Sequence, residues 1–184
     1  MKRYIIFDFD RTIGTLIVDW HDWRKEIFNL ITKEFNQNAN LLPEQIKHAG
    51  QNDLIKKYGA EFREKLNKIN EIAETNLVTD FVANKPILDF IQNTERILYC
   101  WSSNSRATLD RYMHKLGIKN KFKKIISRED VFLLKPDTEG FKYIYTPGAR
   151  KKDYVFIGDS DVDKDTAEAC GIEFLHVDDF RLEA

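Results

Sequence analysis

Acidic residues are concentrated at two points of the chain, each directly after a short apolar segment. Asp8 and Asp10 follow the first of these segments, and Asp159, Asp161 and Asp163 follow a later one. Carboxylates that converge in one place repel one another unless a cation lies among them. A small cluster of hard oxygen ligands suits Mg²⁺, which also accepts phosphate oxygens in its coordination shell. The two clusters therefore favour a magnesium-assisted reaction of a phosphate group.

Each cluster alone is a weak signal. Asp-x-Asp often stands in a solvated turn, and acidic residues at the start of a helix are favoured there by the helix dipole. The two together are more specific, because open α/β sheets bind their ligands beyond the carboxyl ends of the strands, where both clusters would meet. One residue between Asp8 and Asp10 also directs both side chains to the same side of an extended chain.

The segments that must position these acids alternate between strand and helix patterns. Five segments are apolar along most of their length, as in strands whose two faces are both covered. Several of the helical patterns begin near proline or end at glycine. This alternation predicts an α/β fold with a doubly wound, parallel, five-stranded sheet. The predicted strands are residues 4–9, 97–101, 124–127, 154–157 and 174–177, and the predicted later helices are residues 105–116, 137–146 and 161–170.

Residues 15–84 interrupt the alternation and show only helical patterns. Apolar residues recur there at helical spacing, and a middle helix is expected from about residue 43 to residue 58. We interpret the aromatic stripe of this region as its own core rather than as a ligand site. The sequence therefore predicts a small all-α insertion between two parts of the α/β core, residues 1–14 and 85–184.

Four short motifs occur in a fixed order outside the insertion. They are Asp8-x-Asp10-x-Thr12, then Ser102-Ser103-Asn104, then Lys135-Pro136, and finally Gly158-Asp159-Ser160-x-x-Asp163. With these motifs the chain resembles the haloacid dehalogenase (HAD) superfamily of phosphohydrolases, in its phosphoglycolate-phosphatase-like form with a helical cap after the first motif. The resemblance covers roughly residues 1–14 and 85–178. It implies a HAD-like Rossmannoid core, and a cap that closes over the active site as a mobile lid.

The resemblance also implies catalytic and metal-binding roles. Asp8 is expected to be the nucleophile that forms an aspartyl-phosphate, while Asp10 protonates the leaving oxygen and later takes a proton from water. Lys135 would offset the charge on the nucleophile and the phosphate. The carboxylates of Asp8 and Asp159 and the backbone carbonyl of Asp10 would bind Mg²⁺. Asp163 would lie next to these ligands without binding the ion itself. Alternatively, it would take the place of a water molecule that is bound to one of the ligands.

Phosphate binding is assigned to Thr12 and to the second motif, Ser102, Ser103 and Asn104. The pair Ser103-Asn104 matches a common form of that motif, whereas the spacing to the following Leu-Gly-Ile favours Ser102, so the choice between the two serines stays open. Either serine could instead only cap the next helix. Arg11 stands where the family more often has glycine, and arginine is less able to adopt unusual backbone angles. Its side chain is expected in solvent or near the substrate.

The expected function is hydrolysis of a small phosphomonoester, such as phosphoglycolate, a sugar phosphate or a nucleotide. A phosphomutase would keep every catalytic residue named above, so it remains an alternative. A binding or regulatory protein on the same fold would have lost at least one motif acid, and none is missing. A 2-haloacid dehalogenase is disfavoured because it would not need an acid at Asp10.

The composition supports further expectations. A chain of 184 residues with 42% hydrophobic residues can bury a core, and a net charge of −1 gives no reason to expect a nucleic-acid partner. No segment is long and apolar enough for a membrane span. We expect a soluble, cytoplasmic monomer or weak homodimer that binds a small phosphorylated metabolite. Cys100 and Cys170 are expected to be reduced and buried.

The four histidines lack metal-ligand spacing. They are His21, His48, His114 and His176. Only His176 follows the end of a predicted strand closely enough to be considered for contact with a substrate.

Overall fold

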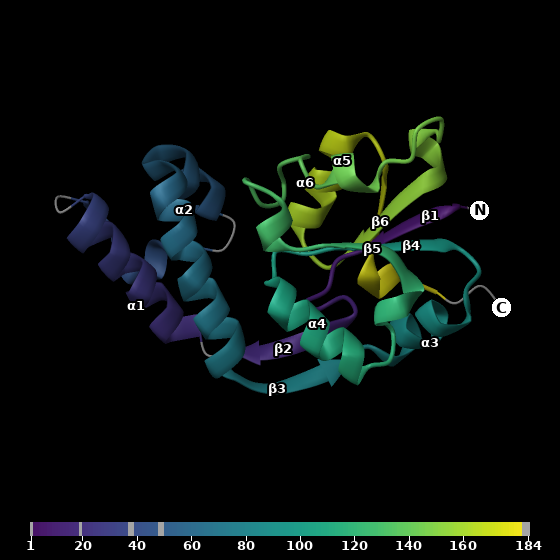
Figure 1. Ribbon diagram of the computed structural model, residues 1–184, viewed down its shortest axis with the longest axis horizontal. Coiled ribbons are helices and arrows are strands. Elements are labelled where there is room, and N and C mark those ends of the chain that lie inside the picture. Colours follow the sequence, from purple (N-terminus) through teal and green to yellow (C-terminus); the bar gives the residue numbers. More distant parts are fainter. Residues whose placement is uncertain (1, 19, 37–38, 48–49, 182–184) are drawn as a thin grey trace. The chain divides into compact units, whose positions relative to one another are not determined.

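The computed structural model describes residues 2–18, 20–36, 39–47 and 50–181 (Figure 1). His48 lies outside these residues. The chain divides into two compact units, the first made of Met1–Leu16 and Phe81–Ala184 and the second of Ile17–Asp80.

The first unit is built around a parallel five-stranded sheet with the order β5-β4-β1-β6-β7. Neighbouring strands are parallel throughout. The predicted doubly wound α/β class is therefore confirmed. The strands are β1 (Tyr4–Phe7), β4 (Ile97–Trp101), β5 (Phe122–Ile126), β6 (Tyr154–Gly158) and β7 (Glu173–His176).

Helices cover both faces of this sheet, with α5 and α6 on one side and α3 and α4 on the other (Figure 1). Every residue of β1 and β6 is buried, because these central strands are covered on both faces. Both cysteines are free and buried, as predicted. The helices are α3 (Lys85–Asn93), α4 (Arg106–Lys115), α5 (Phe141–Ile144) and α6 (Asp161–Cys170).

The helix predicted at residues 137–146 is wrong in extent, since only the single turn α5 forms there. Polar side chains at its expected start bind nearby backbone groups instead. The carboxylate of Asp137 accepts a hydrogen bond from the N–H of Glu139 at 2.9 Å. Glu139 in turn accepts from the N–H of Phe132 at 2.7 Å. Such local side-chain bonds compete with helix formation, which explains the shortened helix.

The second unit is largely helical. Its main elements are α1 (Trp20–Leu30), a π-helical turn (Ile31–Phe35), a 3₁₀ turn (Pro43–Gln45) and α2 (Gln51–Asn76). Trp23 donates through Nε1 to Asn70 at 2.7 Å, which ties α1 to α2 in the core of this unit. The predicted middle helix at 43–58 is wrong in its start, because residues 43–45 form only a 3₁₀ turn and α2 begins at Gln51. Residues 51–58 are helical as predicted, and α2 continues past an interruption at Gly59, where φ is 81°.

Two strands contradict the prediction that residues 15–84 form only helices. β2 (Gly14–Val18) and β3 (Val78–Ala83) pair in a separate two-stranded sheet. Their side chains vary between more buried and more exposed positions along the strands rather than following a helical period, and each segment is short. The division between the two units falls within both strands. Among the residues that the structure describes, none of the helices has the length and apolar character needed to cross a bilayer.

Candidate active site

The two acidic loops meet at the carboxyl ends of the neighbouring central strands β1 and β6. Phe7 lies opposite Ile157 in the parallel ladder, and the N–H of Asp8 donates to the carbonyl of Ile157 at 2.9 Å. As a result, one carboxylate oxygen from each of Asp8, Asp159 and Asp163 lies within 4.8 Å of the others. The structure thus brings together three of the acids that the sequence assigned to a metal.

The loop after β1 is a tight turn held by backbone hydrogen bonds. The N–H groups of Thr12, Ile13 and Gly14 all donate to the carbonyl of Phe9, at 3.3, 2.9 and 3.2 Å. Arg11 has φ of 58°, in the left-handed region that favours glycine, and its side chain is exposed. An arginine therefore adopts the glycine-like conformation of this turn. Its side chain is exposed to solvent, and its charge still lowers the pKa of both Asp10 and Asp159.

Asp10 and Thr12 project from this turn. Asp10 accepts a hydrogen bond from the N–H of Leu16 at 2.8 Å. Burial raises the pKa of Asp10, and this hydrogen bond only partly offsets the effect. The hydroxyl oxygen of Thr12 is buried and has no hydrogen-bond partner among the described residues. Because buried polar groups normally have a partner, this hydroxyl has capacity left for a ligand.

Lys135 joins the two acidic loops. Its Nζ donates to Asp8 at 2.7 Å and to Asp163 at 2.5 Å, and all three side chains are buried. Burial lowers the pKa of Lys135, but the carboxylates of Asp163 and Asp8 outweigh it and the net shift is upward. Lys135 therefore remains charged, with a counter-ion on each loop.

The charge of Asp8 depends on the cations around it. Burial raises its pKa to about 7, against the opposing effect of Lys135, and the charge of Asp163 raises it further. A nearby divalent cation would lower that pKa, because an opposite charge favours the ionised carboxylate. Added positive charge would therefore favour the ionised form of Asp8.

The loop after β6 is held by side chains. The hydroxyl of Ser160 donates to Asp163 at 2.6 Å and accepts from the N–H of Asp163 at 3.3 Å, so that Ser160 caps α6. A Cβ atom on Gly158 would lie 2.6 Å from atoms of the Asp163 side chain. Glycine is needed at residue 158 because the buried Asp163 packs directly against its backbone.

The serines of the second motif lie at the end of β4. Ser102 is buried, and its hydroxyl donates to the side chain of Asn104 at 2.8 Å. Ser103 is more exposed, and its carbonyl accepts from Arg128 at 3.1 Å. Neither serine caps α4, because Ser105 does so by accepting from the N–H of Thr108. The capping alternative is therefore wrong for both.

The structure does not join every predicted site residue to the acidic cluster. Within the described part of the chain, no hydrogen bond links Ser102, Ser103 or Asn104 to the acids. The choice between the two serines as phosphate ligand remains a prediction. The sequence interpretation missed the capping role of Ser160. It also missed that His176 binds the carbonyl oxygen of Asp159, at 3.0 Å. The proximity of His176 to a strand end was the available signal.

The donor set fits a hard divalent cation. Asp8, Asp159 and Asp163 offer carboxylate oxygens, which are the ligands that Mg²⁺ prefers. Among the described residues Lys135 forms the ion pairs with this cluster, to Asp8 and Asp163, and the charge of Arg11 acts on Asp159, so negative charge exceeds positive charge among the three carboxylates and Lys135. Burial also raises the pKa of Asp159, and the charge of Asp163 adds to the effect. A further cation would relieve this excess of negative charge.

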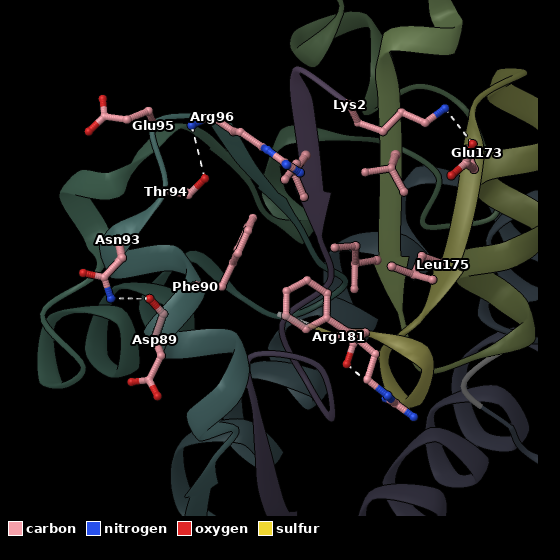
Figure 2. Close-up of a pocket in the computed structure, with 14 residues that line it drawn as sticks. Lys2, Asp89, Phe90, Asn93, Thr94, Glu95, Arg96, Glu173, Leu175 and Arg181 are labelled. Atoms are coloured by element: carbon pink, nitrogen blue, oxygen red, sulfur yellow. Dashed lines mark hydrogen bonds and ion pairs between the residues drawn. The ribbon is translucent and has the colours of Figure 1, made fainter. Parts of the chain in front are cut away.

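A pocket elsewhere in the first unit does not coincide with these acids. It has a volume of about 770 Å³ and lies against one face of the sheet near α3 (Figure 2). Figure 2 shows apolar side chains such as Phe90 and Leu175 along it, and an ion pair between Lys2 and Glu173 at its edge, 2.6 Å apart. None of the described residues that line it is a predicted site residue.

Comparisons with known proteins agree with this geometry. The family model described as haloacid dehalogenase-like hydrolase matches residues 5–177. No curated protein matches the chain by sequence.

Several solved structures share the fold. A protein described as a candidate phosphoglycolate phosphatase, from Lactobacillus plantarum, is 19% identical with a TM-score of 0.66, over 96% of this chain and 86% of that one. YfnB from Bacillus subtilis, a candidate HAD-hydrolase solved with bound magnesium, is 20% identical (TM-score 0.54, 94% and 85%). A candidate β-phosphoglucomutase from Thermotoga maritima is 14% identical (TM-score 0.53, 94% and 83%). At these identities the likeness shows a common fold.

Proposed function

The chain belongs to the haloacid dehalogenase-like hydrolase family, and we propose that it is a magnesium-dependent phosphatase that acts on a small phosphomonoester. The observation that carries the proposal is the cluster in which Lys135 bridges Asp8 and Asp163, with Asp159 beside them. Such a cluster places a buried carboxylate next to positive charge, which is what attack on an anionic phosphate requires.

In the first step an oxygen of Asp8 attacks phosphorus, and the bond from phosphorus to the leaving alcohol breaks. Asp10 donates its proton to that leaving oxygen, so that a neutral alcohol departs. The raised pKa of Asp10, caused by burial, favours the protonated form that this step needs. Lys135 compensates negative charge on Asp8 while the aspartyl-phosphate forms.

In the second step water attacks the phosphorus of the aspartyl-phosphate. Asp10, now a carboxylate, takes a proton from this water, and the bond between phosphorus and Asp8 breaks. Inorganic phosphate leaves, Asp8 is restored as a carboxylate, and Asp10 again holds a proton. Asp10 thus serves both half-reactions, as the acid in the first and as the base in the second. It donates one proton in the first step and takes one proton from water in the second.

Other residues of the chain bind and orient. The carboxylates of Asp8 and Asp159 and the carbonyl of Asp10 are the proposed ligands of Mg²⁺, with Asp163 beside them. Bound Mg²⁺ would supply positive charge that offsets the negative charge of the nucleophile and of the phosphate. The free hydroxyl of Thr12 is proposed to donate to a phosphoryl oxygen, together with Ser102 or Ser103.

The proposed substrate class is a small phosphorylated metabolite. The Lactobacillus protein described as a phosphoglycolate phosphatase and the Thermotoga protein described as a β-phosphoglucomutase support a sugar or carboxylic-acid phosphate. The second of these keeps a phosphomutase as the alternative function, since a mutase would keep every catalytic residue named above. A mutase would transfer the phosphoryl group between positions of a sugar without net release of phosphate.

The test is turnover of p-nitrophenyl phosphate by the full chain with Mg²⁺, with EDTA, and in an Asp8→Asn variant. We expect Mg²⁺-dependent release of phosphate that falls by at least about a thousandfold in Asp8→Asn. Asp161→Asn is the matched control, because Asp161 is an exposed acid of the same α6 terminus outside the cluster. Turnover that survives Asp8→Asn would remove the nucleophile assignment. A panel of phosphorylated metabolites then separates hydrolysis from phosphoryl transfer.

A further inference from the structure

His176 is bound to the loop that follows β6. It ends β7 and lies opposite Gly158 in the parallel ladder of β6 and β7. Its Nδ1 accepts a hydrogen bond from the N–H of Asp178 at 3.2 Å. The neutral ring then carries its proton on Nε2, which lies 3.0 Å from the carbonyl oxygen of Asp159. His176 therefore donates to the backbone of a residue whose carboxylate belongs to the acidic cluster.

The three acids of the cluster differ in how their carboxylates are oriented. Asp8 is held by Lys135, and Asp163 is held by both Lys135 and Ser160. Among the described residues, no side chain donates a hydrogen bond to the carboxylate of Asp159. That carboxylate is also more exposed than the other two. Its direction therefore depends on how the backbone at residue 159 is held, with the charges of Arg11 and Lys135 acting on it without a hydrogen bond.

We propose that His176 is a positioning residue for the metal site, because its Nε2–H group fixes the peptide from which the Asp159 carboxylate extends. This inference rests on the metal site of the proposed function and adds a residue outside its four motifs. The hydrogen bond keeps the Asp159 carboxylate directed toward Asp8 and Asp163 before a cation arrives. A cation then binds without having to order the loop itself, since partners that orient metal ligands raise metal affinity.

Packing alone does not account for His176. Its side chain is 38% exposed, so part of the ring remains in contact with solvent and the ring is not enclosed in the core. Its ring does contact that of Phe174, with centroids 6.4 Å apart in an edge-to-face arrangement. Phe174 lies on the same strand and makes no hydrogen bond to the loop with its apolar side chain. This pair therefore allows the contribution of packing to be separated from that of the hydrogen bond.

The test uses three variants of the full chain. His176→Leu removes the donor, His176→Gln offers an amide N–H in its place, and Phe174→Leu alters packing on the same strand. Binding of Mn²⁺ to the metal-free protein is measured by electron paramagnetic resonance of the free ion. The Mg²⁺ concentration for half-maximal turnover of p-nitrophenyl phosphate is measured alongside KM for that substrate. Thermal unfolding checks that each variant is folded.

We expect His176→Leu to weaken Mn²⁺ binding and to raise the half-maximal Mg²⁺ concentration, each by about tenfold or more. KM at saturating Mg²⁺ stays near its wild-type value. His176→Gln recovers most of the affinity, whereas Phe174→Leu lowers the melting temperature without changing Mn²⁺ binding.

The inference is overturned if His176→Leu binds Mn²⁺ as the wild type does, if Phe174→Leu weakens binding equally, or if the wild type binds no Mn²⁺. The first two results leave the proposed phosphatase activity intact. Conversely, a wild-type protein that binds Mn²⁺ with an affinity that depends on His176 but hydrolyses no phosphate ester would refute the proposed function and leave the role of His176 standing.

Discussion

The loops that follow β1 and β6 bring the same kind of residue to the same edge of the sheet, but different bonds hold them. In the β1 loop, three backbone N–H groups converge on the carbonyl of Phe9. In the β6 loop, the side chains of Ser160 and Asp163 bind each other, and His176 binds the backbone from a neighbouring strand. The first loop is therefore defined by its backbone, and the second by particular side chains.

This difference determines which substitutions each loop can accept. A turn held by backbone bonds tolerates many side chains, as the arginine at residue 11 illustrates with its φ of 58°. A loop held by side chains loses its geometry when one of them is removed. Lys135 contacts acids from both loops, so its removal should have the largest effect of all.

Lys135→Met should destabilise the metal-free protein by about 3–5 kcal/mol, because it leaves two buried carboxylates without their shared cation. Chemical denaturation at neutral pH measures the change in free energy of unfolding. Lys164→Met is the control, since Lys164 is exposed and directly follows Asp163. If both variants unfold alike, Lys135 does not couple the two loops. Turnover with Mg²⁺ should also fall sharply in Lys135→Met alone.

The next effect concerns pH and belongs to Asp8. Burial raises the pKa of this carboxyl from 3.8 to about 7 in the folded chain. A carboxyl whose pKa is raised on folding stabilises the protein below its unfolded-state pKa, and this contribution is lost as the pH rises toward the folded value. The metal-free wild type should therefore lose stability relative to Asp8→Asn between about pH 4 and pH 7, by up to about 4 kcal/mol.

Melting temperatures of both proteins across this pH range, without metal and with Mg²⁺, test that prediction. Mg²⁺ should restore the wild type near and above pH 7, because it binds the ionised carboxylate, and should affect Asp8→Asn less. A constant difference between the two metal-free proteins from pH 4 to pH 8 would show that Asp8 titrates as an ordinary exposed acid.

Two serines provide a matched comparison with a smaller effect. Ser105 caps α4 and Ser160 caps α6, and each side chain accepts the N–H of the residue three positions later. Replacing either by alanine should reduce stability by about 1 kcal/mol. Only Ser160→Ala should also weaken Mn²⁺ binding, because Ser160 additionally donates to Asp163. Equal metal affinity in the two variants would contradict the view that side chains define the β6 loop.

Apolar patterns predicted the sheet because its strands are covered on both faces. The prediction at residues 154–157 differs from β6 by one residue at its end. The helical patterns did not reveal β2 and β3, since each strand is short and its partner lies about sixty residues away. The length of the helix at 137–146 was overestimated because the carboxylates of Asp137 and Glu139 accept hydrogen bonds from nearby backbone N–H groups. The spacing of apolar residues carries no information about such bonds.

Motif order predicted which acids would converge, because parallel strands bring their carboxyl ends to one edge. It could not predict the bonds that orient those acids. The bridge from Lys135 to Asp163 and the bond from His176 to Asp159 join elements that are distant in the chain or separated by a helix. Likewise, the sequence did not predict the conformation of the turn after Asp10, because Arg11 stands where the family more often has glycine. In the structure, backbone hydrogen bonds of the turn hold Arg11 in the left-handed conformation that glycine favours.

Arg11→Gly should have the smallest effect on stability. Whether it raises or lowers the free energy of unfolding tests whether backbone hydrogen bonds hold the β1 loop. A non-glycine residue in the left-handed region costs about 1–2 kcal/mol, and glycine relieves this strain. Glycine also makes the unfolded chain more flexible, which offsets about 0.4–1 kcal/mol of the gain. We therefore expect a stabilisation between zero and about 1.6 kcal/mol, with no loss of Mn²⁺ binding. Because the charge of Arg11 lowers the pKa of Asp10, its removal should let Asp10 keep its proton to higher pH and shift the pH–rate profile in that direction. A loss of several kcal/mol in Arg11→Gly would instead show that the arginine side chain, and not the backbone, holds this turn.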